Sequence, residues 1–254
     1  MQAAAAFGFE AAPRVSERGI LIDLHPAATV RSALFNAIPL RQSTRGEYDS
    51  RPLNSNELSE LEKASTPGSC VSLALLTDRR SIDRVRDLVI AGNTTQMADP
   101  AFVEELKAWI RFSRSEAVES GDGLFSGSSG NMAVPRWLGS RLFSWFFTPA
   151  AENDKYARQM NSSAGVAVFA APRADRAGWV AAGRACERFL LQAAALDIRT
   201  AFVNQPVETP ALRPQLAAAA GLGALRPDLV VRFGRGPSLP ASLRRPAVAV
   251  ILAN

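Results

Sequence analysis

Apolar positions along the chain fall into two kinds of pattern, and the first is the short, nearly uninterrupted run. Runs of four to seven residues rich in valine, leucine, isoleucine and phenylalanine are typical of strands. The sequence predicts such strands at Gly19–Leu24, Val71–Leu76, Gly165–Ala170, Arg199–Val203, Leu229–Gly234 and, in the tail, Pro246–Leu252. The composition of Val71–Leu76 indicates a largely buried strand. We therefore expect a sheet of about five strands.

The second pattern is apolar spacing of three and four residues, which predicts helices between the strands. Capping residues mark several helix starts: Asn54 or Ser55, then Ser81, then Asp99 with Pro100 in the first turn. The predicted helices are Thr29–Ile38, a helix from Asn54 or Ser55 to about Ser65, helices beginning at Ser81 and near Asp99, Asp175–Leu196, and one from Pro210 to about Ala220. Interleaved helices and strands indicate one α+β domain.

Two consecutive segments interrupt this alternation. Residues 119–131 are rich in glycine and serine, and we expect a mobile loop there. The loop is not a phosphate-binding loop of the P-loop kind, because no Gly-Lys-Ser/Thr follows. Residues 135–147 are aromatic, with Trp137, Phe143, Trp145, Phe146 and Phe147. This cluster is either part of the core or a lid over a flat ligand.

A basic segment follows the first predicted helix. Arg41, Gln42, Ser43, Thr44 and Arg45 place two arginines on either side of a hydroxyl residue. Two guanidinium groups and a hydroxyl at a helix end suit a phosphate, because each arginine can donate paired hydrogen bonds to its oxygens. The alternative is a solvated basic turn.

Composition narrows the class of ligand. The chain has 254 residues and a formal net charge of +5, and many of its positive residues are arginines, which favours an anionic ligand. No Lys/Arg tail or nucleic-acid motif occurs, so we do not expect nucleic-acid binding. Cys70, Cys186 and the single His25 form no zinc-binding or Cys–His pattern, and both thiols are expected to be reduced and buried in a cytoplasmic protein. The sequence predicts neither a signal peptide nor a membrane-spanning segment.

Three segments together resemble the nitroreductase family of flavin proteins. The first is Arg41–Arg45, followed by Tyr48 and Pro52, which is similar to the family's Arg-x-Ser-x-Arg/Lys motif. The second is the passage from Ala201 to Glu208 after the long helix, and the third is Leu243–Pro246 after a Val-Val-Arg-Phe-Gly strand. The resemblance covers roughly residues 30–252 and is closest to the C-terminal part of the dormancy-associated (Acg-type) branch, in which two nitroreductase-like halves are fused.

The resemblance implies a mostly antiparallel nitroreductase-like fold, FMN as cofactor and NAD(P)H as co-substrate. It implies hydride transfer to a flat, electron-poor acceptor such as a nitroaromatic compound or a quinone. It also implies a homodimer with flavin at the interface. The residues that would bind the cofactor are Arg41, Gln42, Ser43, Arg45, Gln205, Pro206, Val207, Glu208, Arg244 and Arg245. No catalytic side chain is expected, because hydride transfer needs neither a nucleophile nor a protein acid.

The chain also departs from the family pattern. The Pro-Ser-x-x-Asn-x-Gln-Pro-Trp segment that completes the partner's flavin pocket in ordinary members is absent, and Thr66–Cys70 stands in its place. We expect residues 1–29 to be a remnant of a first half, and residues 30–254 to form the domain, with a lid-like insertion at about 119–160. The departure leaves two alternatives to a reductase: a non-catalytic protein that sequesters FMN, and a degenerate homologue without flavin.

Overall fold

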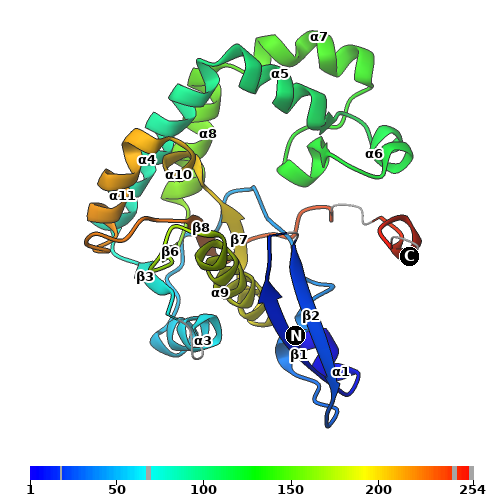
Figure 1. Cartoon of the computed structure of the whole chain (residues 1–254). Coiled ribbons are helices and arrows are strands. Elements are labelled where there is room, and N and C mark those ends of the chain that lie inside the picture. Colours follow the sequence, from blue (N-terminus) through cyan, green and yellow to red (C-terminus); the bar gives the residue numbers. More distant parts are fainter. Residues whose placement is uncertain (18, 67–69, 242–244, 252–254) are drawn as a thin grey trace.

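A four-stranded antiparallel sheet lies at the centre of the computed structural model, which describes residues 1–17, 19–66, 70–241 and 245–251 (Figure 1). The strands are β3 (Ser72–Leu76), β6 (Gly165–Ala170), β7 (Arg199–Phe202) and β8 (Leu229–Gly234), in the order β3–β6–β8–β7. All four match predicted apolar runs, so the mostly antiparallel α+β fold is confirmed. The central sheet has four strands, slightly fewer than expected.

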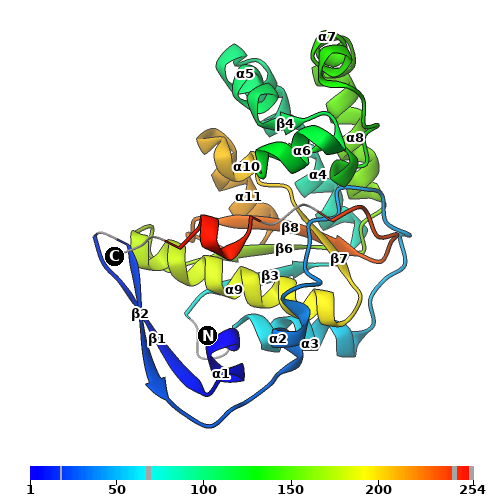
Figure 2. The same ribbon diagram turned by 90° about the vertical axis from the view of Figure 1, so that its right-hand side faces the viewer.

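Helices cover both faces of this sheet (Figure 2). One face packs against α3 (Ser55–Ser65) and α9 (Arg176–Ala195), and the other against α4 (Arg79–Met97), α8 (Pro149–Asn161) and α11 (Arg213–Ala219). Successive side chains of a strand point to opposite faces, so Phe169 joins the first core cluster and Val168 the second. The ring of Phe189 from α9 lies 5.7 Å from that of Phe169. Burial of these apolar side chains on both faces stabilises the sheet.

Side-chain caps fix where the helices begin. Asn54 and Glu57 form a capping box at the start of α3, with both side-chain-to-backbone bonds at 2.9 Å. The helix predicted to start at Ser81 begins earlier, because Asp78 is the N-cap and accepts a 2.9 Å bond from the Ser81 amide. Asp175 caps α9 in the same way, and the helix begins close to the predicted position.

The N-terminal region forms a hairpin outside the central sheet. It comprises α1 (Gln2–Ala6), β1 (Phe9–Val15), β2 (Ile20–Pro26) and α2 (Ala33–Ala37). The predicted strand at Gly19–Leu24 exists as β2, but it pairs antiparallel with β1, which its composition did not predict. The predicted helix Thr29–Ile38 is shorter, because Ser32 caps it.

A helical lobe projects from the sheet between α4 and α8 (Figure 1). It contains α5 (Pro100–Trp109), β4 (Ile110–Arg111), α6 (Arg114–Ser120), β5 (Leu124–Phe125), the 3₁₀ turn η1 (Ser126–Ser129) and α7 (Arg136–Phe146). The expectation of a loop at 119–131 was wrong, because β5 pairs with β4 and Ser126, Ser128 and Ser129 are buried.

Three further expectations need correction. Where a strand was predicted in the tail, the described residues up to 251 form only the 3₁₀ turn η3 (Ala247–Ala249). The strand β3 is half-buried along its length, because it lies at the edge of the sheet. Cys70 is exposed and only Cys186 is buried, where burial raises the pKa of its thiol to about 12.

No helix within the described ranges is long and apolar enough to cross a bilayer.

Candidate functional site

The arginine segment is attached to the open edge of the central sheet. It follows α2, and Ser43 forms an isolated parallel bridge with Thr200 of the edge strand β7. The Thr44 amide donates a 2.8 Å hydrogen bond to the Thr200 carbonyl. This pairing holds the backbone between Arg41 and Arg45 against the edge of the sheet.

Arg232 of the central sheet holds the arginine segment through hydrogen bonds to its backbone carbonyls. It lies on β8, is fully buried, and donates hydrogen bonds to the carbonyls of Gly46 at 2.7 Å and of Thr44 and Gln159 at 3.2 Å. Its guanidinium carbon lies 4.2 Å from the centre of the Tyr48 ring. Burial lowers the pKa of Arg232, and the nearby Tyr48 partly opposes that shift. Arg232 therefore holds the arginine segment in one backbone conformation.

The role of Arg232 is not predicted by the motifs in the sequence. The available signal was a single arginine inside the apolar strand Leu229–Gly234, where an unpaired charge is costly. Such a residue has to find several acceptors, but the sequence does not show that carbonyls of residues 44, 46 and 159 supply them.

The two arginines of the segment have different surroundings. Arg41 forms an ion pair with Glu187 of α9, with Nε 3.1 Å from Oε1. Arg45 is largely buried, and in the part of the chain that the structure describes it has no carboxylate within ion-pair distance. Burial lowers the pKa of Arg45, while the nearby Tyr156 and Tyr48 oppose the shift. Arg45 is therefore the cation of this segment that can accept an anion from outside.

The end of the predicted segment Ala201–Glu208 lies near Arg45, with Tyr156 close to both. It folds as a single turn, α10 (Gln205–Glu208), with Gln205, Pro206 and Val207 buried. Tyr156 of α8 lies close to both Arg45 and the Gln205 side chain, and both of these groups act to lower the pKa of its hydroxyl. Burial raises the pKa of the Tyr156 hydroxyl to about 12. The structure thus brings the first two predicted segments together.

Two buried acceptor atoms in these segments have no hydrogen-bond partner among the described residues. They are Oγ1 of Thr44 and Oε1 of Gln205. An unpaired buried polar atom costs about 1–3 kcal/mol, so it marks a place where a ligand or water completes the structure. Glu208, in contrast, is already occupied, because its Oε2 accepts a 2.6 Å bond from Gln96.

The third predicted segment is only partly described. The tail passes the arginine segment, where Nε2 of Gln42 donates a 2.9 Å bond to the Leu239 carbonyl. It then reaches the helical lobe, where Arg245 lies beside Gly121 and near Asp122. A hydrogen bond from Arg111 is the main cause that lowers the pKa of Asp122, and Arg245 adds a smaller contribution. Arg244 lies outside the described residues, so only Arg245 of the two is placed.

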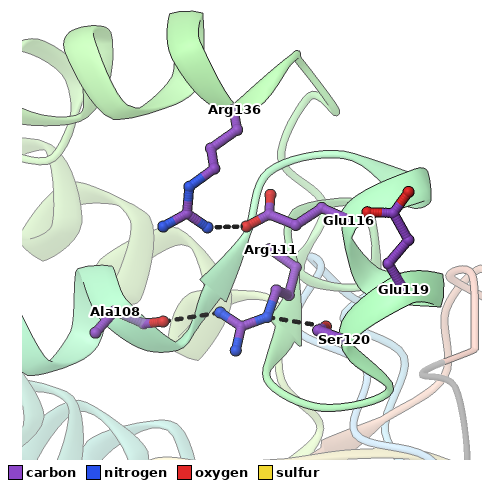
Figure 3. Close-up of a pocket in the computed structure, with 6 residues that line it drawn as sticks. All are labelled: Ala108, Arg111, Glu116, Glu119, Ser120 and Arg136. Carbon is purple, nitrogen blue, oxygen red and sulfur yellow. Dashed lines mark hydrogen bonds and ion pairs between the residues drawn. The ribbon is translucent and has the colours of Figure 1, made fainter.

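The helical lobe carries an open pocket of about 450 Å³ at a different place (Figure 3). Its lining is Ala108, Arg111, Glu116, Glu119, Ser120 and Arg136. Both arginines of the lining are paired: Arg136 with Glu116 of the lining, and Arg111 with Asp122 beside it at 2.6 Å. None of the residues predicted from the sequence lines this pocket, and its paired charges leave little for a ligand.

The aromatic segment contributes both to the lobe's core and to its surface. Phe143 is buried against Phe112 and stacks on Phe147 with ring centres 4.6 Å apart. Trp137 and Trp145 are 66% and 80% exposed. The side chain of Phe146 lies outside the described part of the structure. Core and surface roles therefore coexist in α7.

The contact between α4 and α10 yields a prediction. Gly92 of α4 packs so closely on Gln205 that a Cβ atom there would lie 2.7 Å from the Gln205 carbonyl carbon. Gly92→Ala should therefore push Gln205 away and lower the free energy of unfolding by about 1–3 kcal/mol, as overpacking does. Gly183→Ala on α9 is the control, since nothing lies within 4 Å of its Cβ position. Urea unfolding of both variants checks this, and equal midpoints would contradict the packing argument.

Comparison with solved structures establishes the fold. A nitroreductase with bound FMN from Desulfitobacterium hafniense aligns with a TM-score of 0.54 and 10% identity over 89% of this chain and 100% of that one. Oxidised iodotyrosine deiodinase bound to FMN and 3-iodo-L-tyrosine aligns with a TM-score of 0.54, 10% identity and coverage of 87% and 97%. An NADPH:FMN oxidoreductase from Vibrio harveyi complexed with NAD+ aligns with 0.51, 13% identity and coverage of 88% and 77%.

No protein-family model matches the sequence, and no curated protein matches it either. At identities between 10% and 13%, the structural similarity concerns the fold. The chain is therefore similar in fold to nitroreductase-like proteins, several of which hold FMN in their structures.

Proposed function

We propose that the chain is an FMN-binding oxidoreductase that transfers hydride from NAD(P)H to a flat, electron-poor acceptor. The observation that carries the proposal is Arg45, a largely buried guanidinium without a carboxylate partner in the described structure, close to Gln205 through Tyr156. A buried cation is costly unless an anion compensates it, and FMN brings a dianionic phosphate.

The surrounding atoms fit such a ligand. Thr44 Oγ1 and Gln205 Oε1 are buried acceptors without partners in the described structure, and a ligand with N–H or O–H groups would satisfy them. Arg41, Gln42, Ser43 and Arg45 would hold the phosphate and the ring edge from one side. Gln205, Pro206 and Val207 would contact the ring from the other side, whereas Glu208 is held by Gln96 and Arg245 lies in the helical lobe beside Asp122.

Bound FMN would supply the redox chemistry by accepting a hydride and passing it to the acceptor. The task of the chain is to bind, orient and shield. A guanidinium close to a site of developing negative charge stabilises that charge, and the partial burial of Arg45 strengthens the effect because fewer water molecules screen it.

The exposed ring of Trp137 offers a stacking surface for a flat acceptor. Trp137→Ala should lower kcat/KM for a nitroaromatic acceptor by about tenfold. The stacking of a flat ring, such as a nucleic-acid base, on an aromatic side chain is worth about 1–3 kcal/mol. FMN content should stay unchanged, since Trp137 belongs to the lobe and not to the arginine segment. Steady-state kinetics and the flavin spectrum of the same preparation check this. Unchanged kcat/KM would remove Trp137 from the acceptor site.

A non-catalytic FMN-sequestering protein is the second candidate. The helical lobe favours it, because residues 119–131 are built into folded structure with three buried serines, which suits a rigid cover. In that case residues of about 119–160 act as a lid over the flavin. We further propose that two copies share the flavin interface as a homodimer.

Rapid mixing of the FMN-loaded protein with NADPH or NADH in the absence of oxygen tests the catalytic proposal. A reductase loses its flavin absorption quickly and regains it when a nitroaromatic compound or a quinone is added. Retention of FMN with no bleaching by either nicotinamide would select the sequestering protein. Absence of FMN binding would indicate a degenerate homologue.

A further inference from the structure

Within the part of the chain that the structure describes, the β2 edge of the hairpin of β1 and β2 pairs with no further strand. The amide of Ala27 bonds to the Gly8 carbonyl and that of Ser16 to the Gly19 carbonyl, both at 2.8 Å. Bonded and non-bonded pairs alternate in an antiparallel ladder, so the intervening odd-numbered residues of β2 use their backbone groups on β1. The N–H and C=O groups of Ile20, Ile22 and Leu24 therefore point outward from the hairpin.

The other edge of the hairpin is protected. In the same alternation Pro13 of β1 occupies an outward-pointing position, and proline has no N–H to offer. β1 also contacts α9 and α1 of its own chain. A proline and a covering helix are common means of blocking an edge. Ile20–Leu24 of β2 contain no proline, and their exposure shows that no described helix covers them.

The side chains of β2 show that this strand lacks a neighbour. Four apolar side chains on the two faces of the strand are at least half exposed: Ile20 (52%), Leu21 (50%), Ile22 (56%) and Leu24 (53%). A two-stranded hairpin is marginally stable alone and gains stability from a third strand. A long apolar edge of this kind is a template for strand addition.

We infer that β2 pairs antiparallel with β2 of a second copy of this chain, about a two-fold axis at Ile22. In this register Ile22 faces Ile22 of the second copy, and Ile20 faces Leu24 in both directions. These are the three residues whose backbone groups point outward, so each of their N–H and C=O groups gains a partner. The result is a continuous four-stranded sheet in the order β1–β2–β2–β1.

The charges of the strand agree with this arrangement. Asp23 would face Leu21 of the second copy, and its carboxylate is already paired with Arg14 of its own hairpin at 2.6 Å. No like charges stand opposite each other, and the contacts across the axis join isoleucine and leucine, which stabilise cross-strand pairs. The contact is isologous, as expected for a two-fold dimer. This inference does not depend on the proposed flavin function.

Charge placed on the axis tests the inference in the full-length chain. Ile22→Lys puts two lysines directly opposite each other and should weaken the association about tenfold or more, which halves the mass of the assembly in sedimentation velocity. Leu21→Lys is the matched control, because residue 21 is equally exposed but would face Asp23 of the second copy. That variant should keep the wild-type mass.

Mixing gives a second readout specific to the two-fold axis. Ile22→Lys and Ile22→Glu should each dissociate alone and associate with each other when mixed, because the lysine then faces a glutamate. An assembly whose mass Ile22→Lys does not change would overturn the inference, even if a flavin-site dimer persists. Equal weakening by Leu21→Lys would also overturn it, because the register would be wrong. If β2 binds a different protein and not a second copy of this chain, the inferred self-pairing is overturned and that protein is the partner of the β2 edge.

Discussion

Arg232→Met is expected to lower the free energy of unfolding by about 3 kcal/mol or more. Methionine has a comparable length but no donor, so the buried carbonyls of Thr44, Gly46 and Gln159 would lose their hydrogen bonds. Each buried acceptor without a partner costs about 1–3 kcal/mol. The contact with the Tyr48 ring would also be lost.

Urea unfolding of the purified variant measures this effect. Arg158→Met is a suitable control, because Arg158 contacts the same loop through Glu47 but both side chains are more than half exposed. An exposed ion pair contributes about 0–1 kcal/mol, so the control should stay close to wild type. Similar midpoints for the two variants would show that Arg232 does not hold the arginine segment.

Arg45→Met should weaken FMN binding by about 10- to 100-fold. A charge-assisted hydrogen bond to phosphate is worth about 1.5–3 kcal/mol, and each 1.4 kcal/mol corresponds to a factor of ten. Removal of a largely buried cation that lacks a carboxylate partner in the described structure should not destabilise the fold. Loss of affinity without loss of stability is therefore the signature of a ligand-binding role.

Titration of flavin fluorescence with wild type, Arg45→Met and Arg158→Met separates this role from a general effect of charge. The control removes an exposed arginine that is paired with Glu47, so both variants lose one positive charge. FMN affinity that falls equally in both would indicate nonspecific attraction, and affinity that falls in neither would exclude Arg45 from the phosphate site.

The sequence predicts the elements whose signal is local. Gly165–Ala170 is apolar at every position and becomes β6, buried throughout. The long helix predicted from Asp175 to Leu196 is α9, and the structure shows that the Asp175 carboxylate caps its first turn. Elements of this kind form the two core clusters, so the fold follows from periodicity and capping.

Elements that depend on distant partners are where the predictions were wrong. The tail Pro246–Leu252 has the composition of a strand, but the described part forms only a 3₁₀ turn there. Composition also gave no sign of β1, because a strand with few buried side chains lacks a clear apolar period. Exposure of Cys70 depends likewise on where neighbouring elements lie.

In the candidate site, too, the local motif can be predicted from the sequence, but its contacts with distant residues cannot. Arg41, Ser43 and Arg45 are visible as a motif, but their different surroundings depend on Glu187, Tyr156 and Thr200, which are far away in sequence. Sequence spacing treats the two arginines alike. The structure shows that α9 pairs Arg41 through Glu187, whereas Arg45 has no carboxylate within ion-pair distance among the described residues.

The most direct measurement is the absorption spectrum of the purified full-length chain, before and after addition of FMN and removal of the unbound flavin. We expect a flavin band that stays with the protein through desalting, at a stoichiometry near one FMN per chain. Arg45→Met should lose the band under the same conditions, while Arg158→Met should keep it. A wild-type protein that remains colourless after addition of FMN would contradict the proposed function.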